Sequence, residues 1–459
     1  MIMMVICFVV LFYAIGLYNK CRKRQALIIF YMFLSGCFHL VPEEWMNGAP
    51  INKFPDFALL YFLYVCVRNM GSSSFYRPAL SSYKTMNILL VYIVIEFIAT
   101  VMLGNEQFMF ALKTFRTYIL LGSYLLVAEL DREDVIKLVK QISIITLITT
   151  LLYLSQPVIG LKMLHHASIG EGVDGISRYR NIPYLAYFFL IYFTVKLKFT
   201  SLKSVLYLLL FIAALLLTQH RGIMIGYVMA VGLYLIISRN SERIIQYAII
   251  GILVMGVAGQ YLENRFNQDN TSDDISNVLS LDYKSAVAQG FDVEGGATLS
   301  FRVLLLMERI DYLVNNPKYL LTGVGVRHED SPNTSRDFDF FLGTRKPNPV
   351  TGQWEPCQIS SADLAWLSPL MRFGLIGLIL FTIFTLQNMK ILFLNRKSSN
   401  LAMSAFLFYM LLFFISFKND FLFSDLHLFL LYLLIAITQN RQQNYIENES
   451  LDINLFKGI

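Results

Sequence analysis

Long runs of apolar residues, separated by short polar connectors, follow one another along nearly the whole sequence. Runs of roughly 17–22 residues recur, and each of these is long enough for one helix to cross about 30 Å of hydrocarbon. The regular polar and apolar alternation of barrel strands is absent. We therefore predict an all-α polytopic membrane bundle with about 12–13 transmembrane helices. The predicted spans are 2–18, 26–41, 54–68, 85–103, 107–128, 141–159, 182–197, 203–218, 222–238, 244–261, 364–386, 401–417 and 421–438.

Basic residues in the connectors indicate which ends of the spans face the cytoplasm. When the spans simply alternate, the connectors rich in Lys and Arg all fall on one side, which we assign to the cytoplasm. The opposite side is predicted to be extracytoplasmic, which in a bacterial inner membrane is the periplasmic side. The basic connectors are 19–25, 68–84, 131–141, 196–203, 239–243 and 387–400.

A polar segment of about a hundred residues, from Glu263 to Asp363, interrupts the series of spans on the periplasmic side. It contains FRVLLLMERIDYLV, which is apolar at helical spacing and is followed by an Asn-Asn-Pro stop, so we predict a helix over about 299–315. Part of this loop should therefore fold as a lobe. The predicted boundaries are 1–262 for the N-terminal spans, 263–363 for the periplasmic loop lobe, 364–440 for the C-terminal spans and 441–459 for a cytoplasmic tail.

Composition excludes several functional classes. Hydrophobic residues make up 56% of the chain and charged residues only 15%, which is typical of an integral membrane protein. The net charge of +6 is spread over connectors instead of gathered with aromatics on one face, so no nucleic acid is expected. The five cysteines and the adjacent His165 and His166 lack metal-ligand spacing, and we predict neither a metal nor a cofactor.

The stretch TQHRGIMIG, residues 218–226, places His220 and Arg221 between two apolar runs. An arginine close to the membrane interface can extend its guanidinium group to water at little cost. Alternatively, it binds an anion, because the positive-inside pattern disfavours an outward arginine and Gly222 lets a ligand approach the backbone. The sequence leaves both interpretations open.

Two arginines lie seven residues apart on the predicted loop helix. Glu308 adjoins Arg309, which favours a local ion pair on a solvated helix face. Arg302 has no acidic residue three or four positions away, and it enters an apolar stretch. Arg302 is therefore the stronger candidate for contact with a ligand.

Four further cations are candidates for substrate binding. Lys113 and Arg116 share one helix face inside the fifth predicted span, where buried cations usually face a cavity with a partner or a ligand. Either Glu96 of the preceding span or a substrate can satisfy them. Arg178 and Arg180 lie on the outward side near a helix start, where a surface role is the simpler interpretation.

The layout and several short motifs resemble the membrane O-antigen polymerases and O-antigen ligases of bacterial surface-polysaccharide assembly. QHRGIMIG occupies the position of that family's Ser/Arg-Gly motif, and Arg302 precedes Pro317 and LLTGVG as in the family's loop. DLAWLSPLMRFGLIGLILF is similar to the re-entry segment, with the glycine pair Gly374 and Gly377. Counting back from Gly374, Asp363 stands where the ligases have a histidine.

The resemblance implies a GT-C-like bundle that performs metal-independent, inverting glycosyl transfer in the bacterial inner membrane, at its periplasmic face. Its substrate would be an undecaprenyl-pyrophosphate-linked oligosaccharide. Guanidinium groups suit the departing pyrophosphate because they bind phosphates bidentately and neutralise their charge. The expected catalytic residues are Arg221, Arg302 and Asp363, and the expected substrate-binding residues are Arg309, His220, Lys113, Arg116, Arg178 and Arg180.

Three functions fit this resemblance in different ways. The missing histidine favours a polymerase of oligosaccharide repeat units over a ligase that transfers polysaccharide to lipid A-core. A lipid-linked oligosaccharide flippase would need two comparable halves, whereas this chain has a large loop on one side. Besides the lipid bilayer, a chain-length regulator and a flippase are candidate partners of a polymerase.

Overall fold

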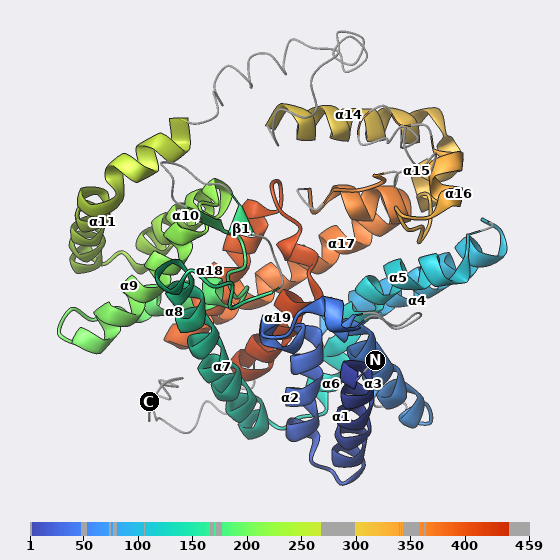
Figure 1. The fold of residues 1–459 in the computed structure, drawn as a ribbon, viewed down its shortest axis with the longest axis horizontal. Helices are drawn as coiled ribbons and strands as arrows, with labels where there is room; N and C mark the ends of the chain where they lie inside the picture. The colour runs from blue at the N-terminus through green and yellow to red at the C-terminus, as the bar shows by residue number, and fades with distance from the viewer. Residues whose placement is uncertain are drawn as a thin grey trace.

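The structure is a computed structural model, and Figure 1 shows a bundle of helices with a further layer of helices along one side. The N-terminal helices lie opposite that layer, and the last helix, α19, lies near the centre of the bundle. The described residues are 2–46, 53–72, 75–76, 80–104, 106–165, 169–170, 177–267, 299–338, 340, 342, 358–361 and 364–439.

Helices account for almost all regular structure in this part of the chain, so the prediction of an all-α polytopic membrane protein is confirmed. Within the described residues, six helices are long and apolar enough to cross a membrane, namely α1, α4, α7, α10, α11 and α17, and α8, α9, α18 and α19 are shorter apolar helices. The helices and turns before the loop are α1 (Ile2–Asn19), α2 (Lys23–Leu34), η1 (Cys37–His39), η2 (Glu43–Met46), α3 (Phe54–Arg68), α4 (Ser81–Met102), α5 (Phe108–Ile119), η3 (Leu120–Ser123), α6 (Tyr124–Ala128), α7 (Arg132–Ile159), α8 (Ala186–Lys196), α9 (Leu202–Leu217), α10 (Arg221–Ser238) and α11 (Ser241–Asn267). Those after it are α17 (Leu367–Asn395), α18 (Asn400–Ile415), η5 (Phe421–Phe423) and α19 (Asp425–Gln439).

Every predicted span overlaps a helix, but several boundaries differ. The span 107–128 is not continuous, because the 3-10 turn η3 separates α5 from α6. The basic connector 131–141 mostly forms the first turns of α7, and α17 likewise extends to Asn395. Hydropathy marks where the apolar part of a helix ends, whereas the helix itself can continue into polar surroundings because it satisfies its own backbone.

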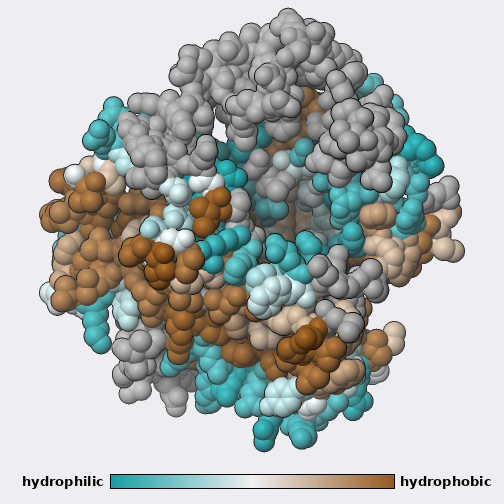
Figure 2. Space-filling view, viewed as in Figure 1, coloured by the Kyte–Doolittle hydropathy of each residue, from teal (hydrophilic) through white to brown (hydrophobic). Residues whose placement is uncertain are grey.

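The centre and the edge of the bundle differ in exposure. Almost every residue of α8 and α19 is buried, and the Tyr432 hydroxyl of α19 donates to the Leu121 carbonyl of η3 at 2.8 Å. In α11, by contrast, Ile252 is 72% exposed and Val257 91% exposed. Figure 2 shows the surface around α9, α10 and α11 as largely hydrophobic, as expected for helices that face lipid.

The layer along the top of Figure 1 is the lobe, formed by α14 (Leu299–Asn315), α15 (Pro317–Thr322) and α16 (Pro332–Asp337). The predicted loop helix is confirmed, and it ends where Asn316 and Pro317 begin the next helix. The lobe has an apolar core of its own, which includes two residues of α17. The members of this core are Leu304, Leu305, Leu313, Val324, Phe338, Phe340, Leu342, Ile359, Leu367 and Met371.

The glycine motif of the lobe joins it to a break in α17. Gly374 has φ +61° and ψ −159°, which interrupts the helix and frees the carbonyls just before it. The Val324 N–H donates to the Met371 carbonyl at 2.8 Å, and the Gly325 N–H donates to the Arg372 carbonyl at 3.1 Å. A Cβ atom at Gly374 would collide with the Leu321 backbone. The two backbones can therefore approach this closely only because glycine stands here.

Candidate functional site

The turn between α9 and α10 places its charged residues at a helix end, outside the apolar runs. Gln219 has φ +52°, and His220 is the N-cap of α10, with Nδ1 accepting from the Ile223 N–H at 3.4 Å. Arg221 is the first residue of α10. Because the first N–H groups of a helix lack intrahelical partners, this end of α10 carries a partial positive charge.

Cations from three other segments gather around His220. The Arg178 Nε donates to the Thr218 carbonyl at 3.2 Å. Burial is the largest cause that lowers the pKa of His220 to about 3, and the charges of Arg178, Lys418 and Arg302 act in the same direction. The imidazole is therefore neutral at pH 7. With Nδ1 accepting, its Nε2 carries the proton and can donate.

We refer to Arg178, Arg302 and Lys418, whose charges act on His220, together with the adjacent Arg221 as the cation cluster. Lys418 follows α18 and lies directly against the turn, since a Cβ atom at Gly222 would stand 2.8 Å from the Lys418 Cδ. Gly222 thus makes room for a lysine side chain of the protein itself, whereas the sequence suggested room for a ligand.

Arg302 of α14 is buried, with 7% of its surface exposed, and lies within electrostatic reach of His220. The structure thus brings this lobe arginine to the turn that contains Arg221. A shared clamp formed by the two guanidinium groups stays a prediction.

Two short strands, β1 (Ile169–Gly170) and β2 (Arg178–Tyr179), pair in antiparallel direction. The candidate Arg178 lies in β2, and the candidate Arg180 follows directly after it. Arg178 joins the cation cluster, whereas Arg180 is exposed. Residues two positions apart in a strand point to the same face. The strand ends at Tyr179, so this relation does not extend to Arg180.

Arg309 has a different environment from Arg302 although both belong to α14. Its Nη1 lies 2.6 Å from the Glu308 Oε2, and its guanidinium carbon lies 3.7 Å from the centre of the Phe340 ring. Its Nη2 donates to the carbonyls of Leu342 and Gln358 at 2.7 and 2.6 Å. The expected ion pair with Glu308 exists, but it is buried in the lobe and not solvated, and these contacts hold the lobe together.

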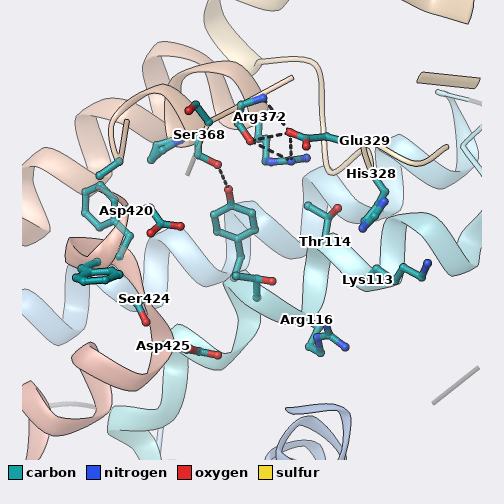
Figure 3. Close-up of a pocket in the computed structure, with 18 of the residues that line it drawn as sticks. Lys113, Thr114, Arg116, His328, Glu329, Ser368, Arg372, Asp420, Ser424 and Asp425 are labelled. Atoms are coloured by element: carbon teal, nitrogen blue, oxygen red, sulfur yellow. Dashed lines mark hydrogen bonds and ion pairs between the residues drawn. The ribbon is translucent and has the colours of Figure 1, made fainter. Parts of the chain in front are cut away.

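A cavity of about 720 Å³ lies between α5, the start of α17 and the segment that precedes α19 (Figure 3). Figure 2 shows this face of the molecule hollowed near its centre, with hydrophilic residues around the hollow. The lining combines aromatic rings, hydroxyl groups and charges of both signs. Its charged residues are Lys113, Arg116, His328, Glu329, Asp330, Arg372, Asp420 and Asp425.

Lys113 and Arg116 both line this cavity, as Figure 3 shows. Arg116 forms an ion pair with Asp56 of α3. The sequence had suggested Glu96 or a substrate as its partner. The Lys113 Nζ lies 5.1 Å from the centre of the Phe110 ring. One of these two cations thus has a protein carboxylate as its partner.

Sequence reasoning missed Arg372, which lies two residues before the break in α17. Its Nη1 donates to the Arg327 carbonyl, and its Nη2 lies 3.7 Å from the Glu329 Oε1. Burial lowers the pKa of His328 and outweighs the opposite effect of Asp330. The motif PLMRFG contained the available signal, a lone arginine beside a glycine in an apolar segment.

Asp420 and Asp425 were also missed, because they lie on either side of the start of the last predicted span, where polar residues are ordinary. Figure 3 shows the Asp420 carboxylate directed into the cavity. Lys418 of the cation cluster precedes Asp420 by two residues, so one short segment borders both regions. Asp363, the third predicted catalytic residue, lies outside the described residues.

The turn with His220 and Arg221, the lobe and the first part of α17 fall within one stretch of sequence. Residues 206–382 match the family model described as O-antigen ligase. This match supports the O-antigen ligase and polymerase superfamily and does not distinguish its two activities. It ends before Lys418 and Asp420. No curated protein matches the sequence closely enough for comparison.

Proposed function

We propose that the protein is a polymerase of surface polysaccharide that joins undecaprenyl-pyrophosphate-linked oligosaccharide repeat units. The observation that carries the proposal is the convergence of Arg178, Arg302 and Lys418 on the turn of His220 at the N-terminus of α10. Helix N-termini and guanidinium groups both favour bound phosphate. The family match over the same turn and the lobe supports a lipid-linked saccharide as the source of that phosphate.

In the proposed reaction, a hydroxyl group of the acceptor attacks the anomeric carbon of the donor sugar. The bond from that carbon to the pyrophosphate oxygen breaks, and undecaprenyl pyrophosphate leaves with the electron pair. A single displacement of this kind inverts the anomeric configuration. The cation cluster stabilises the charge that develops on the leaving group, and the neutral His220 can donate from Nε2. The cluster and the lobe would then face the periplasm.

The ligase alternative uses the same chemistry with lipid A-core as the acceptor, and the family match fits it equally well. The sequence supports the polymerase because Asp363 stands where the ligases carry a histidine. Cells that lack the gene separate the two activities. Loss of a polymerase leaves surface antigen with a single repeat, whereas loss of a ligase leaves lipid A-core without any repeat.

The cation cluster is tested by Arg221→Ala and Arg302→Ala. Each change should abolish long polysaccharide chains at matched protein level. Loss of a contact that matters most in the transition state costs about 3–4 kcal/mol, or roughly a hundred- to a thousand-fold in rate. Lysine should restore little activity, because a point charge cannot grip two phosphate oxygens as a guanidinium group does.

The matched control is Arg239→Ala, at the opposite end of α10 from Arg221. Alanine keeps the Cβ atom, so the left-handed backbone at position 239 is disturbed little. The polysaccharide ladder of this variant should be normal on a gel. A normal ladder from both Arg221→Ala and Arg302→Ala would refute the proposed role of the cluster.

A further inference from the structure

The cavity lined by Asp420, two residues after Lys418 of the cation cluster, has the chemistry of a sugar site. Tyr118, Tyr184, Phe421 and Phe423 supply aromatic surface. The faces of sugar rings carry C–H groups that pack on such rings, while their hydroxyl groups need hydrogen-bonding partners. Ser368 and several carboxylates supply these partners, and the volume of about 720 Å³ is enough for a short oligosaccharide.

Glu329, Asp330 and Asp425 each contact residues beside them in the cavity wall. The Glu329 Oε1 accepts from the Ser360 N–H at 3.0 Å and lies 3.7 Å from the Arg372 Nη2. The Asp330 Oδ2 lies 3.5 Å from the His328 Nδ1. Asp425 begins α19, and its Oδ1 accepts from the Leu426 N–H at 2.7 Å. Each of these carboxylates thus orders a neighbouring segment.

Asp420 differs in its direction and its position. It is exposed, and Figure 3 shows its carboxylate directed into the cavity. In that view, Asp420 lies between Ser368 and Ser424. Its backbone is fixed, because the Phe423 N–H donates to its carbonyl at 3.1 Å. The adjacent Asn419 is buried, and its Oδ1 accepts from the Phe421 N–H at 2.9 Å. A carboxylate on a fixed turn keeps a constant position relative to a bound sugar.

We propose that the cavity binds the terminal sugar of the acceptor and that Asp420 is the general base of the transfer. This inference rests on the proposed function. The Asp420 carboxylate takes the proton from the attacking hydroxyl group as its oxygen forms the new glycosidic bond. The pyrophosphate leaves on the side of Lys418, two residues away in the chain. The segment before α19 thus contacts the acceptor on one side and the leaving group on the other.

The test compares Asp420→Asn with the parent protein in detergent, using the lipid-linked repeat unit extracted from a strain that lacks this protein. The rate at saturating substrate should fall about a hundred- to ten-thousand-fold, which is the usual contribution of a general base. The acidic limb of the pH–rate profile should disappear. Sodium formate, a small external base, should restore part of the rate of Asp420→Gly. Glu44→Gln, which changes an exposed carboxylate outside the cavity, is the control and should behave like the parent.

Binding of inorganic pyrophosphate, followed by the thermal shift that it causes, reports on the cation cluster separately. Asp420→Asn should keep this shift, whereas Arg302→Ala should lose it. If Asp420→Asn transfers within about threefold of the parent while Arg302→Ala does not, the base is refuted and the proposed function stands. If Asp420→Gly gains nothing from formate, Asp420 is not the base. If both Asp420→Asn and Arg302→Ala transfer normally, the proposed function itself fails.

Discussion

The cation cluster and the cavity border the same short segment, yet their charged side chains are arranged differently. Around His220, the charges of Arg178, Arg302 and Lys418 act in the same direction on one imidazole. In the cavity, Arg116 has Asp56 as a partner and Arg372 lies near Glu329. In the proposed function, the pyrophosphate of the donor supplies negative charge to this cluster. In the cavity, by contrast, cations with carboxylate partners suit the proposed sugar ligand, which carries little charge.

Charge reversal tests this contrast most strongly. Arg302→Glu should lower the transfer rate by more than roughly ten-thousand-fold, because the variant loses a phosphate contact and adds repulsion of several kcal/mol. Lys113→Glu should lower it by about tenfold at most, since the cavity already contains charges of both signs. The transfer rates of the two purified variants are measured with the extracted lipid-linked repeat unit and compared with that of the parent. Equal losses from the two reversals would remove the distinction between the regions.

The two arginines of α14 give a second test, on stability. Arg309→Met should lower the free energy of unfolding by about 3–5 kcal/mol, because it leaves Glu308 buried without its cation. Arg302→Met should cost less than Arg309→Met, since removing this charge also relieves its repulsion with the other cations around His220. Denaturant melts in detergent measure both changes. The double variant Glu308→Gln/Arg309→Met should recover part of the loss, and comparable destabilisation by both single changes would contradict this contrast.

The smallest expected effect is a pH dependence that originates from His220. Its pKa is about 3 in the folded protein and 6.5 without the protein environment, so between these values the unfolded chain binds a proton that the folded protein does not. The free energy of unfolding should therefore fall as the pH drops below 6.5, by about 1–2 kcal/mol at pH 5. Melts of the parent and of His220→Gln between pH 7 and pH 5 should show this loss in the parent alone. In Arg302→Met, the loss of stability between pH 7 and pH 5 should be smaller than in the parent, because one charge that lowers the pKa of His220 is removed. An equal loss in Arg302→Met and the parent would contradict this explanation.

The spans and the loop helix could be predicted from the sequence because their signals are local. A segment inside lipid must satisfy its own backbone, so a long apolar run becomes a helix whatever lies beside it. The stop at Asn316 and Pro317 is likewise written in adjacent residues. The same local signals identified the turn with Arg221, and they also drew attention to Arg302.

The partners of these residues depend on which helices pack together, and the tertiary structure decided them. Arg116 lies nearer in sequence to Glu96 but pairs with Asp56, because the packing of α5 and α3 brings these two side chains together. Lys113, Arg372 and Asp420 share one cavity although hundreds of residues separate the first from the others. Arg302 and Arg309 have the same residue type and the same helix, yet one faces the cluster and the other the core of the lobe. The sequence determined where helices form because hydrogen bonds within a helix are local, whereas the meeting of side chains from distant segments depends on the packing of the whole chain.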